Sequence, residues 1–156
     1  MIRSALLLAL AAALTLLPGL ASAQEVQRFT GSAHNATVGV RAALTLDLTR
    51  NGDGTYGLTI DFDHVNLFGE VTATGRPPLT EDGYLACAEG HECIVFDGTI
   101  TLDSRAGFDD GTVTSFAMSL DLDGTSGTAM GAYHIGQIPG FTFDQLGTIT
   151  LATPVS

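Results

Sequence analysis

Along the stretch Ala42-Ala43-Leu44-Thr45-Leu46-Asp47-Leu48-Thr49, apolar and polar side chains alternate at every second residue. A period of two places the two sets on opposite faces of a β-strand. Asn-Gly and Asp-Gly pairs follow within 51–54, and both accept the positive φ angles of a tight turn. Residues 56–63 then alternate again, with the apolar set on the even numbers. The sequence therefore predicts a β-hairpin.

The same alternation recurs through the rest of the chain, and no window carries the 3.6-residue stripe of an amphipathic helix. Segments rich in Gly, Pro, Asn and Asp separate the alternating stretches. We expect an all-β fold of about eight or nine strands, forming one closed or nearly closed antiparallel β-barrel, with a β-sandwich as the alternative. In outline this barrel is similar to the calycins, although the chain carries no lipocalin signature and no Trp. Further strands are expected at Gln27–Ala33, Gly69–Gly75, Tyr84–Ala88, Ile94–Asp103, Thr112–Asp123, Thr128–Gly136 and Thr148–Thr153.

The first 23 residues have the pattern of a secretory signal peptide. Arg3 supplies a positive start, an apolar run extends from Ala5 to Leu17, and Ala21-Ser22-Ala23 forms an A-x-A cleavage site. The apolar run is shorter than the ~20 residues that span a bilayer. The cleavage point has no Cys, so a lipid anchor is not indicated. We expect cleavage after Ala23, a single all-β domain over 24–156, and a periplasmic or extracellular protein with no stable membrane anchor.

The chain is strongly acidic, with 17 carboxylates against 6 arginines and a formal charge of −11. Because Arg3 leaves with the signal peptide, the mature chain has five arginines and a charge of −12. This charge repels phosphate backbones and anionic lipid surfaces, so nucleic acid and acidic membranes are excluded as partners. Hydrophobic residues make up 45% of the chain, which is enough to build a core and argues against disorder.

The chain has two cysteines, Cys87 and Cys93, separated by five residues. An oxidising compartment outside the cytoplasm favours a disulfide between them. The alternative is a metal site in which both thiolates join His91 and Glu92, although no second ligand pair lies nearby in the sequence. We expect the disulfide, with the role of pinning the end of a hairpin.

No catalytic motif occurs in the sequence: a nucleophile elbow, a zinc-binding helix motif and a phosphate-binding glycine loop are all absent. The four histidines are scattered, and none has a partner in the sequence that would make it an acid–base catalyst. Two Asp-rich turns, Asn51-Gly52-Asp53-Gly54 and Asp121-Leu122-Asp123-Gly124, resemble fragments of calcium loops but lack the glutamate that completes an EF-hand. We therefore expect no enzyme, no cofactor and no metal site, and interpret these turns as solvated.

A barrel of this size can carry one small apolar ligand, and this is the first functional hypothesis. Small residues at expected inward positions, Ala42, Ala73, Gly98 and Ala129, would leave room for it. The expected lining residues are Phe62, Phe96, Phe116 and Tyr133.

The alternative is a protein-interaction module, an exported inhibitor or envelope adaptor, that uses the apolar connection Ile138–Phe143 as its anchor. Such a connection instead closes the core in many barrels, so both roles remain open. A small outer-membrane barrel is the third hypothesis, which the 7% aromatic content and the absence of Trp disfavour. The candidate portal or interface residues are Leu67, Phe68, Ile138, Phe141 and Phe143.

Overall fold

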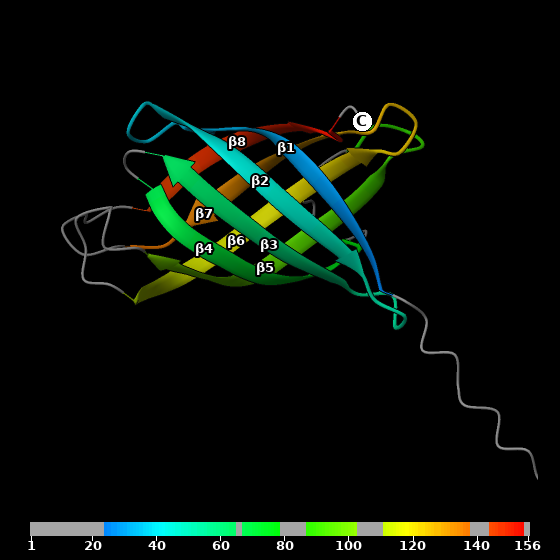
Figure 1. The fold of residues 1–156 in the computed structure, drawn as a ribbon, viewed down its shortest axis with the longest axis horizontal. Helices are drawn as coiled ribbons and strands as arrows, with labels where there is room; N and C mark the ends of the chain where they lie inside the picture. The colour runs from blue at the N-terminus through cyan, green and yellow to red at the C-terminus, as the bar shows by residue number, and fades with distance from the viewer. Residues whose placement is uncertain (1–23, 65–66, 79–86, 103–110, 138–143, 155–156) are drawn as a thin grey trace, which may run out of the picture.

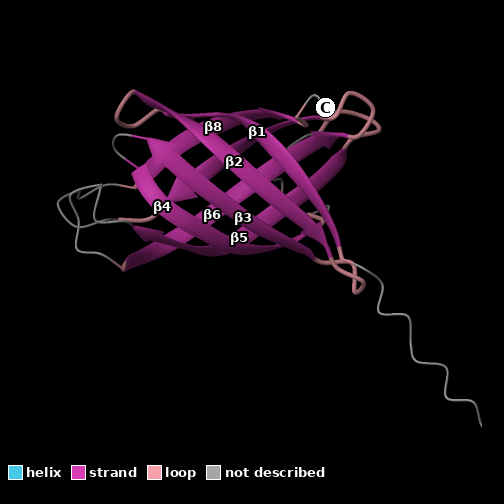
Figure 2. Cartoon of the chain, viewed as in Figure 1, coloured by secondary structure: helices cyan, strands magenta, loops and turns pink. Residues whose placement is uncertain are grey.

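The computed structural model of the chain describes residues 24–64, 67–78, 87–102, 111–137 and 144–154. Regular structure in these residues consists of eight β-strands and no helix, and therefore no helix that could cross a membrane (Figure 2). The strands are β1 (Glu25–Asn35), β2 (Val40–Arg50), β3 (Tyr56–His64), β4 (Leu67–Arg76), β5 (Glu92–Leu102), β6 (Thr112–Asp123), β7 (Thr128–Ile135) and β8 (Gln145–Ala152).

Each strand pairs antiparallel with the next one in the chain, and β8 pairs with β1 to close the barrel (Figure 1). The all-β fold and the closed barrel predicted from the alternation are confirmed, and the sandwich alternative is not found. The strand expected at Tyr84–Ala88 lies mostly outside the described residues, and its last two residues, Cys87 and Ala88, are not in a strand. Strand β8 begins three residues earlier than the expected Thr148.

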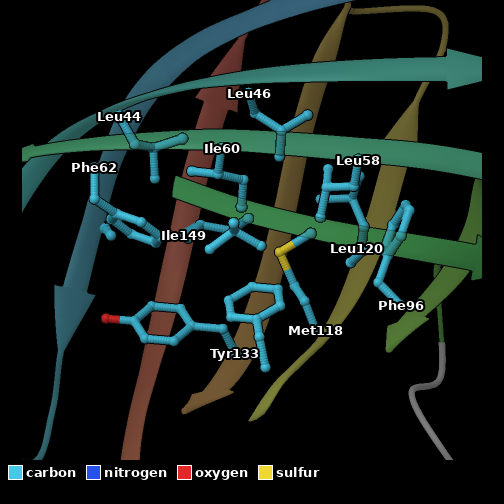
Figure 3. Close-up of a cluster of buried hydrophobic side chains, with 14 of the residues drawn as sticks. Leu44, Leu46, Leu58, Ile60, Phe62, Phe96, Met118, Leu120, Tyr133 and Ile149 are labelled. Carbon is cyan, nitrogen blue, oxygen red and sulfur yellow. The ribbon is translucent and has the colours of Figure 1, made fainter. Parts of the chain in front are cut away.

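The barrel interior is apolar because every second residue of a strand points inward, and the residues at these positions are mainly apolar. In β2, Leu44, Leu46 and Leu48 are buried, while Thr45 and Asp47 between them point outward. Large side chains from opposite walls meet in the centre (Figure 3). The interior includes Phe29, Leu58, Ile60, Phe62, Val71, Ile94, Phe96, Ile100, Leu102, Phe116, Met118, Leu120, Leu122, Tyr133, Ile135, Ile149 and Leu151.

The outer face of the described strands is mainly polar. Thr59, Thr72, Thr99 and Thr148 are exposed, as are carboxylates such as Asp61. A barrel in a lipid bilayer needs the opposite arrangement, with an apolar band facing outward. The outward surface is therefore suited to water.

Glycines allow close packing in the barrel wall and in the core. A Cβ at Gly98 would lie 2.2 Å from the carbonyl oxygen of Thr72 and 2.5 Å from the Cα of Ala73. A Cβ at Gly75 would lie 2.3 Å from the ring of Phe96. The prediction that small inward residues leave a cavity is wrong at Gly98, because its missing side chain allows β4 and β5 to approach closely.

Candidate functional site

Three of the four aromatic residues predicted to line the barrel form one cluster. The ring of Tyr133 lies 6.0 Å from that of Phe62 at an angle of 61°, and 6.4 Å from that of Phe116 at 14°. Both arrangements are favourable for aromatic pairs. The fourth residue, Phe96, is also buried but lies over Gly75 near the end of β4, on the other side of the core (Figure 3).

A row across three strands places polar groups beside this cluster. Tyr133 on β7 is opposite Gly147 on β8, and Gly147 is opposite Asn35 on β1. A Cβ at Gly147 would lie 2.2 Å from Cζ of Tyr133 and 2.3 Å from its hydroxyl oxygen, so the phenol ring covers the glycine. The hydroxyl consequently reaches from β7 across β8 toward β1.

A buried amide pair lies at the same end of the barrel. The Nδ2 of Asn35 donates a hydrogen bond of 2.5 Å to the Oε1 of Gln145, and the two side chains are 2% and 3% exposed. The Oδ1 of Asn35 accepts hydrogen bonds from the backbone N–H groups of Thr37 and Val38, at 3.1 and 3.3 Å. We call this end, defined by Asn35, Tyr133 and Gln145, the amide mouth.

Two donors at the amide mouth have no hydrogen-bond partner in the described part of the chain: the hydroxyl of Tyr133 and the Nε2 of Gln145. No fully enclosed side-chain nitrogen or oxygen atom of the described residues lacks a partner, so both donors touch accessible space although their side chains are 97% covered. Burial raises the pKa of Tyr133 to about 12, so the phenol stays protonated at neutral pH. The amide mouth therefore presents two neutral donors within an apolar surround.

The opposite end of the barrel carries a charged network, and we call it the charged mouth. Arg50 donates to Glu92 at 2.8 Å and to Gln27 at 3.1 Å, and the hydroxyl of Tyr56 donates to the second carboxylate oxygen of Glu92. Two strands, β3 and β4, separate β2 from β5, so the Arg50–Glu92 pair joins strands that are not neighbours. The charged mouth consists of Gln27, Arg50, Tyr56 and Glu92.

The network at the charged mouth perturbs the ionisation of its members. Burial opposes the ionised form of Glu92, but the hydrogen bonds from Tyr56 and Arg50 outweigh it and hold the carboxyl pKa below its usual value. Burial, together with the hydrogen bond to Glu92, raises the pKa of the Tyr56 phenol. Both carboxylate oxygens of Glu92 thus accept hydrogen bonds within the protein, and the network joins β2, β3 and β5 at the charged mouth.

Cys87 and Cys93 lie at disulfide-bonding distance, with their Cα atoms 6.0 Å apart, as predicted. The pair spans the segment before β5, beside the charged mouth. Within it, Nδ1 of His91 lies 2.6 Å from a carboxylate oxygen of Asp121 on β6, which ties the segment to the barrel wall. No group of three His, Cys, Asp or Glu side chains in the described ranges is placed to hold a metal ion.

The side chains of the portal residues predicted from the sequence lie outside the described part of the chain. Ile138, Phe141 and Phe143 lie outside the described residues. Leu67 and Phe68 are the first residues of β4, but their side chains also lie outside the description. The strands that flank 138–143, β7 and β8, have their near ends at the amide mouth.

Sequence reasoning missed the polar residues of both mouths. Asn35 and Gln145 have the same strand parity as buried Ala33 and Ile149, and Arg50 has the parity of Leu48. A polar residue that continues an apolar inward series is a signal that could have been used. The sequence gives no sign, however, that Gln145 and Asn35 meet across the β8–β1 closure, 110 residues apart.

Comparisons with protein-family models, with curated proteins and with solved structures give no match to this chain. The fold and the site by themselves define its class. It is a closed, eight-stranded antiparallel barrel with an apolar interior, one charged mouth whose polar groups bind one another and one amide mouth with two available donors.

Proposed function

We propose that this chain is an exported protein that binds a small, mostly apolar ligand at the amide mouth of its barrel. The observation that carries the proposal is the pair of neutral donors, on Tyr133 and Gln145, that reach accessible space beside three aromatic rings. Small-molecule sites typically combine an apolar, aromatic lining with a few convergent polar groups. No catalytic step is part of the proposal.

The packing of the barrel restricts where such a ligand would lie. Phe62, Phe116 and Tyr133 are 0%, 2% and 3% exposed, and the described interior below them is equally covered. An eight-stranded barrel is just wide enough for its own side chains to fill it. The ligand would therefore sit at the end of the barrel, against the donors of Tyr133 and Gln145, rather than deep in its centre. Because the polar groups of the charged mouth bind one another, the available donors favour entry from the amide mouth.

Export is supported by two independent features. Residues 1–23 have the three-part pattern of a signal peptide, and the cysteine pair lies at disulfide-bonding distance. The outer face of the barrel is mainly polar. This favours a protein dissolved in the periplasm or outside the cell over a barrel embedded in the outer membrane. Amino-terminal sequencing of the protein recovered from the envelope or medium should begin at Gln24. A chain that keeps Met1 and remains in the cytoplasm would contradict export.

Native mass spectrometry of the protein purified from its own cells tests the ligand. We expect a fraction that carries a bound small molecule, and we expect Phe116→Leu to lose it because this change removes a ring of the cluster. Phe96→Leu is the matched control, since it removes an equally buried ring that lies away from the amide mouth. Protein that carries no small molecule under any extraction condition, or equal loss in both variants, would contradict the proposal.

A second candidate, a protein-interaction module, is favoured by the outer face of β7 and β8. No Asp, Glu or Arg lies on the described outward positions of these two strands, although the chain has a charge of −11. Met130 and Leu146 on this face are 63% and 56% exposed. A co-purifying protein that is lost with Met130→Glu and retained with Thr72→Glu, a change on the opposite wall, would favour this candidate.

A further inference from the structure

One side of the barrel wall carries no charge. The strands β6, β7, β8 and β1 are consecutive in the closed sheet (Figure 1). No Asp, Glu or Arg occupies a described outward position of β7 or β8, of 30–34 in β1 or of 113–119 in β6, and we call these positions the uncharged face. Each strand of the other half, β2 to β5, has an outward carboxylate. These carboxylates belong to Asp47, Asp61, Glu70 and Asp97.

Two carboxylates at the ends of the uncharged face are engaged by histidines. Asp121 follows the face on β6 and is opposite Met130 on β7. Its Oδ1 lies 2.6 Å from the Nδ1 of His91. Asp144 precedes β8, and its Oδ2 lies 2.9 Å from the Nε2 of His134. A molecule that covers the face therefore does not need to supply cations at these two positions.

Small residues occupy the middle of the uncharged face, with a large apolar side chain on either side of them. Ala132 on β7 is opposite Thr148 on β8. Met130 and Leu146 flank this pair on opposite sides along the strands, and they are 63% and 56% exposed. The centre of a protein–protein interface is typically depleted in charge and enriched in Met. The uncharged face has both properties.

We propose that the uncharged face binds a second copy of this chain. Because the mature chain has a charge of −12, two copies repel each other wherever their acidic surfaces meet. A two-fold axis that lies in the contact plane places the uncharged face against itself and keeps the carboxylates of β2 to β5 away from the contact. The axis passes between Met130 and Leu146, so that Met130 packs on the partner's Leu146. This inference rests on the second proposed function, the interaction module, and names its partner.

The area of the uncharged face suits a dimer that dissociates readily. Strands about 4.8 Å apart, with outward residues about 6.8 Å apart along each strand, give a face of about 500 Å² per copy. Two copies would bury about 1,000 Å², which is at the lower end for a specific protein–protein contact. The geometry therefore predicts exchange between monomer and dimer rather than a permanent dimer.

Sedimentation equilibrium of the full mature chain, with its disulfide intact, tests the proposal. We expect the average mass to rise from that of one chain toward that of two as the protein concentration increases from about 5 µM to about 500 µM. Raising NaCl from about 0.05 M to about 0.5 M should tighten the dimer about threefold, because salt screens the repulsion between two acidic chains. An interface made of ion pairs would weaken under the same change.

Substitutions at exposed positions test the contact itself, and circular dichroism verifies that each variant is folded. Met130→Glu should weaken the dimer at least about tenfold, because it brings a carboxylate into the contact. Thr72→Glu adds the same charge on the opposite wall and is the matched control, with an expected change of less than about twofold. Leu146→Arg should also weaken self-association. An equimolar mixture of Met130→Glu and Leu146→Arg should associate more tightly than either variant alone, because the two-fold contact brings the new carboxylate to the new guanidinium.

A chain that stays monomeric at every concentration, or a dimer that Met130→Glu and Thr72→Glu weaken equally, would overturn the proposal. A mixture that associates no better than its components would overturn the two-fold contact. If the chain alone is monomeric and a different co-purifying protein is lost with Met130→Glu, self-association is wrong and the interaction module stands. The absence of both a dimer and a co-purifying protein would overturn the interaction module as well.

Discussion

Replacing Gly147 with Ala should destabilise the barrel through Tyr133. The added Cβ would lie 2.2 Å from the Cζ of Tyr133 and 2.3 Å from its hydroxyl oxygen, far inside van der Waals contact. The ring cannot move away freely, because Phe62 and Phe116 contact it. Overpacking of this kind costs about 1–3 kcal/mol, and we expect about 2 kcal/mol for Gly147→Ala because the clash is with a confined ring.

Urea unfolding followed by circular dichroism, at pH 7 and with the disulfide intact, measures this cost. Gly57→Ala is the matched control, since its Cβ would lie 3.5 Å from Thr49, an ordinary contact, and it should change stability by no more than about 0.5 kcal/mol. In a Tyr133→Ala background, Gly147→Ala should cost much less, which gives a coupling energy close to 2 kcal/mol. If Gly147→Ala costs no more than Gly57→Ala, the ring does not cover residue 147 and the geometry of the amide mouth is wrong.

Glu92→Gln should lower the free energy of unfolding by about 1 kcal/mol at pH 7. The expected loss is small because the Arg50–Glu92 pair is one-third exposed and water screens it. Since the pKa of Glu92 is lowered on folding, the wild-type advantage is present above the usual carboxyl pKa of 4.5 and should disappear as the pH of the melts falls below it. Reduction of the Cys87–Cys93 pair should cost about 2 kcal/mol in parallel urea titrations, and thiol labelling of unreduced protein should find neither Cys free. In alkaline titrations read at 295 nm, the difference between wild type and Tyr133→Phe should show Tyr133 ionising near pH 12, and a difference centred at pH 10 would contradict its burial.

The strands could be predicted closely where the alternation is long and regular. In β6, Phe116, Met118, Leu120 and Leu122 are buried and the residues between them are not, as the period of two requires. The strand expected at Tyr84–Ala88 rested on an alternation of only five residues, and the two of them that the structure describes, Cys87 and Ala88, are not in a strand. A run this short does not separate a strand from an extended connection.

The candidate site was predicted only in part, for a physical reason. Phe62, Phe116 and Tyr133 were found because apolar residues on the inward parity must enter a barrel. The sequence could not predict that Phe96 lies away from these three rings. Strand parity predicts which face of a strand a residue is on, but not how far along the barrel axis it lies. That position depends on the strand register, which fixes Phe62 opposite Gly69 and Tyr133 opposite Gly147.

The sequence by itself determined the all-β class, the apolar interior, the acidic outer face and the pairing of the two cysteines, because each follows from local alternation, composition or the lack of another partner. Only the tertiary structure decided that the two ends of the barrel differ. Closure of β8 on β1 brings Asn35 to Gln145, and the approach of β2 to β5 brings Arg50 to Glu92. These contacts join residues 110 and 42 positions apart. Which polar groups bind one another and which remain available therefore depends on how the sheet closes, and no local pattern encodes that.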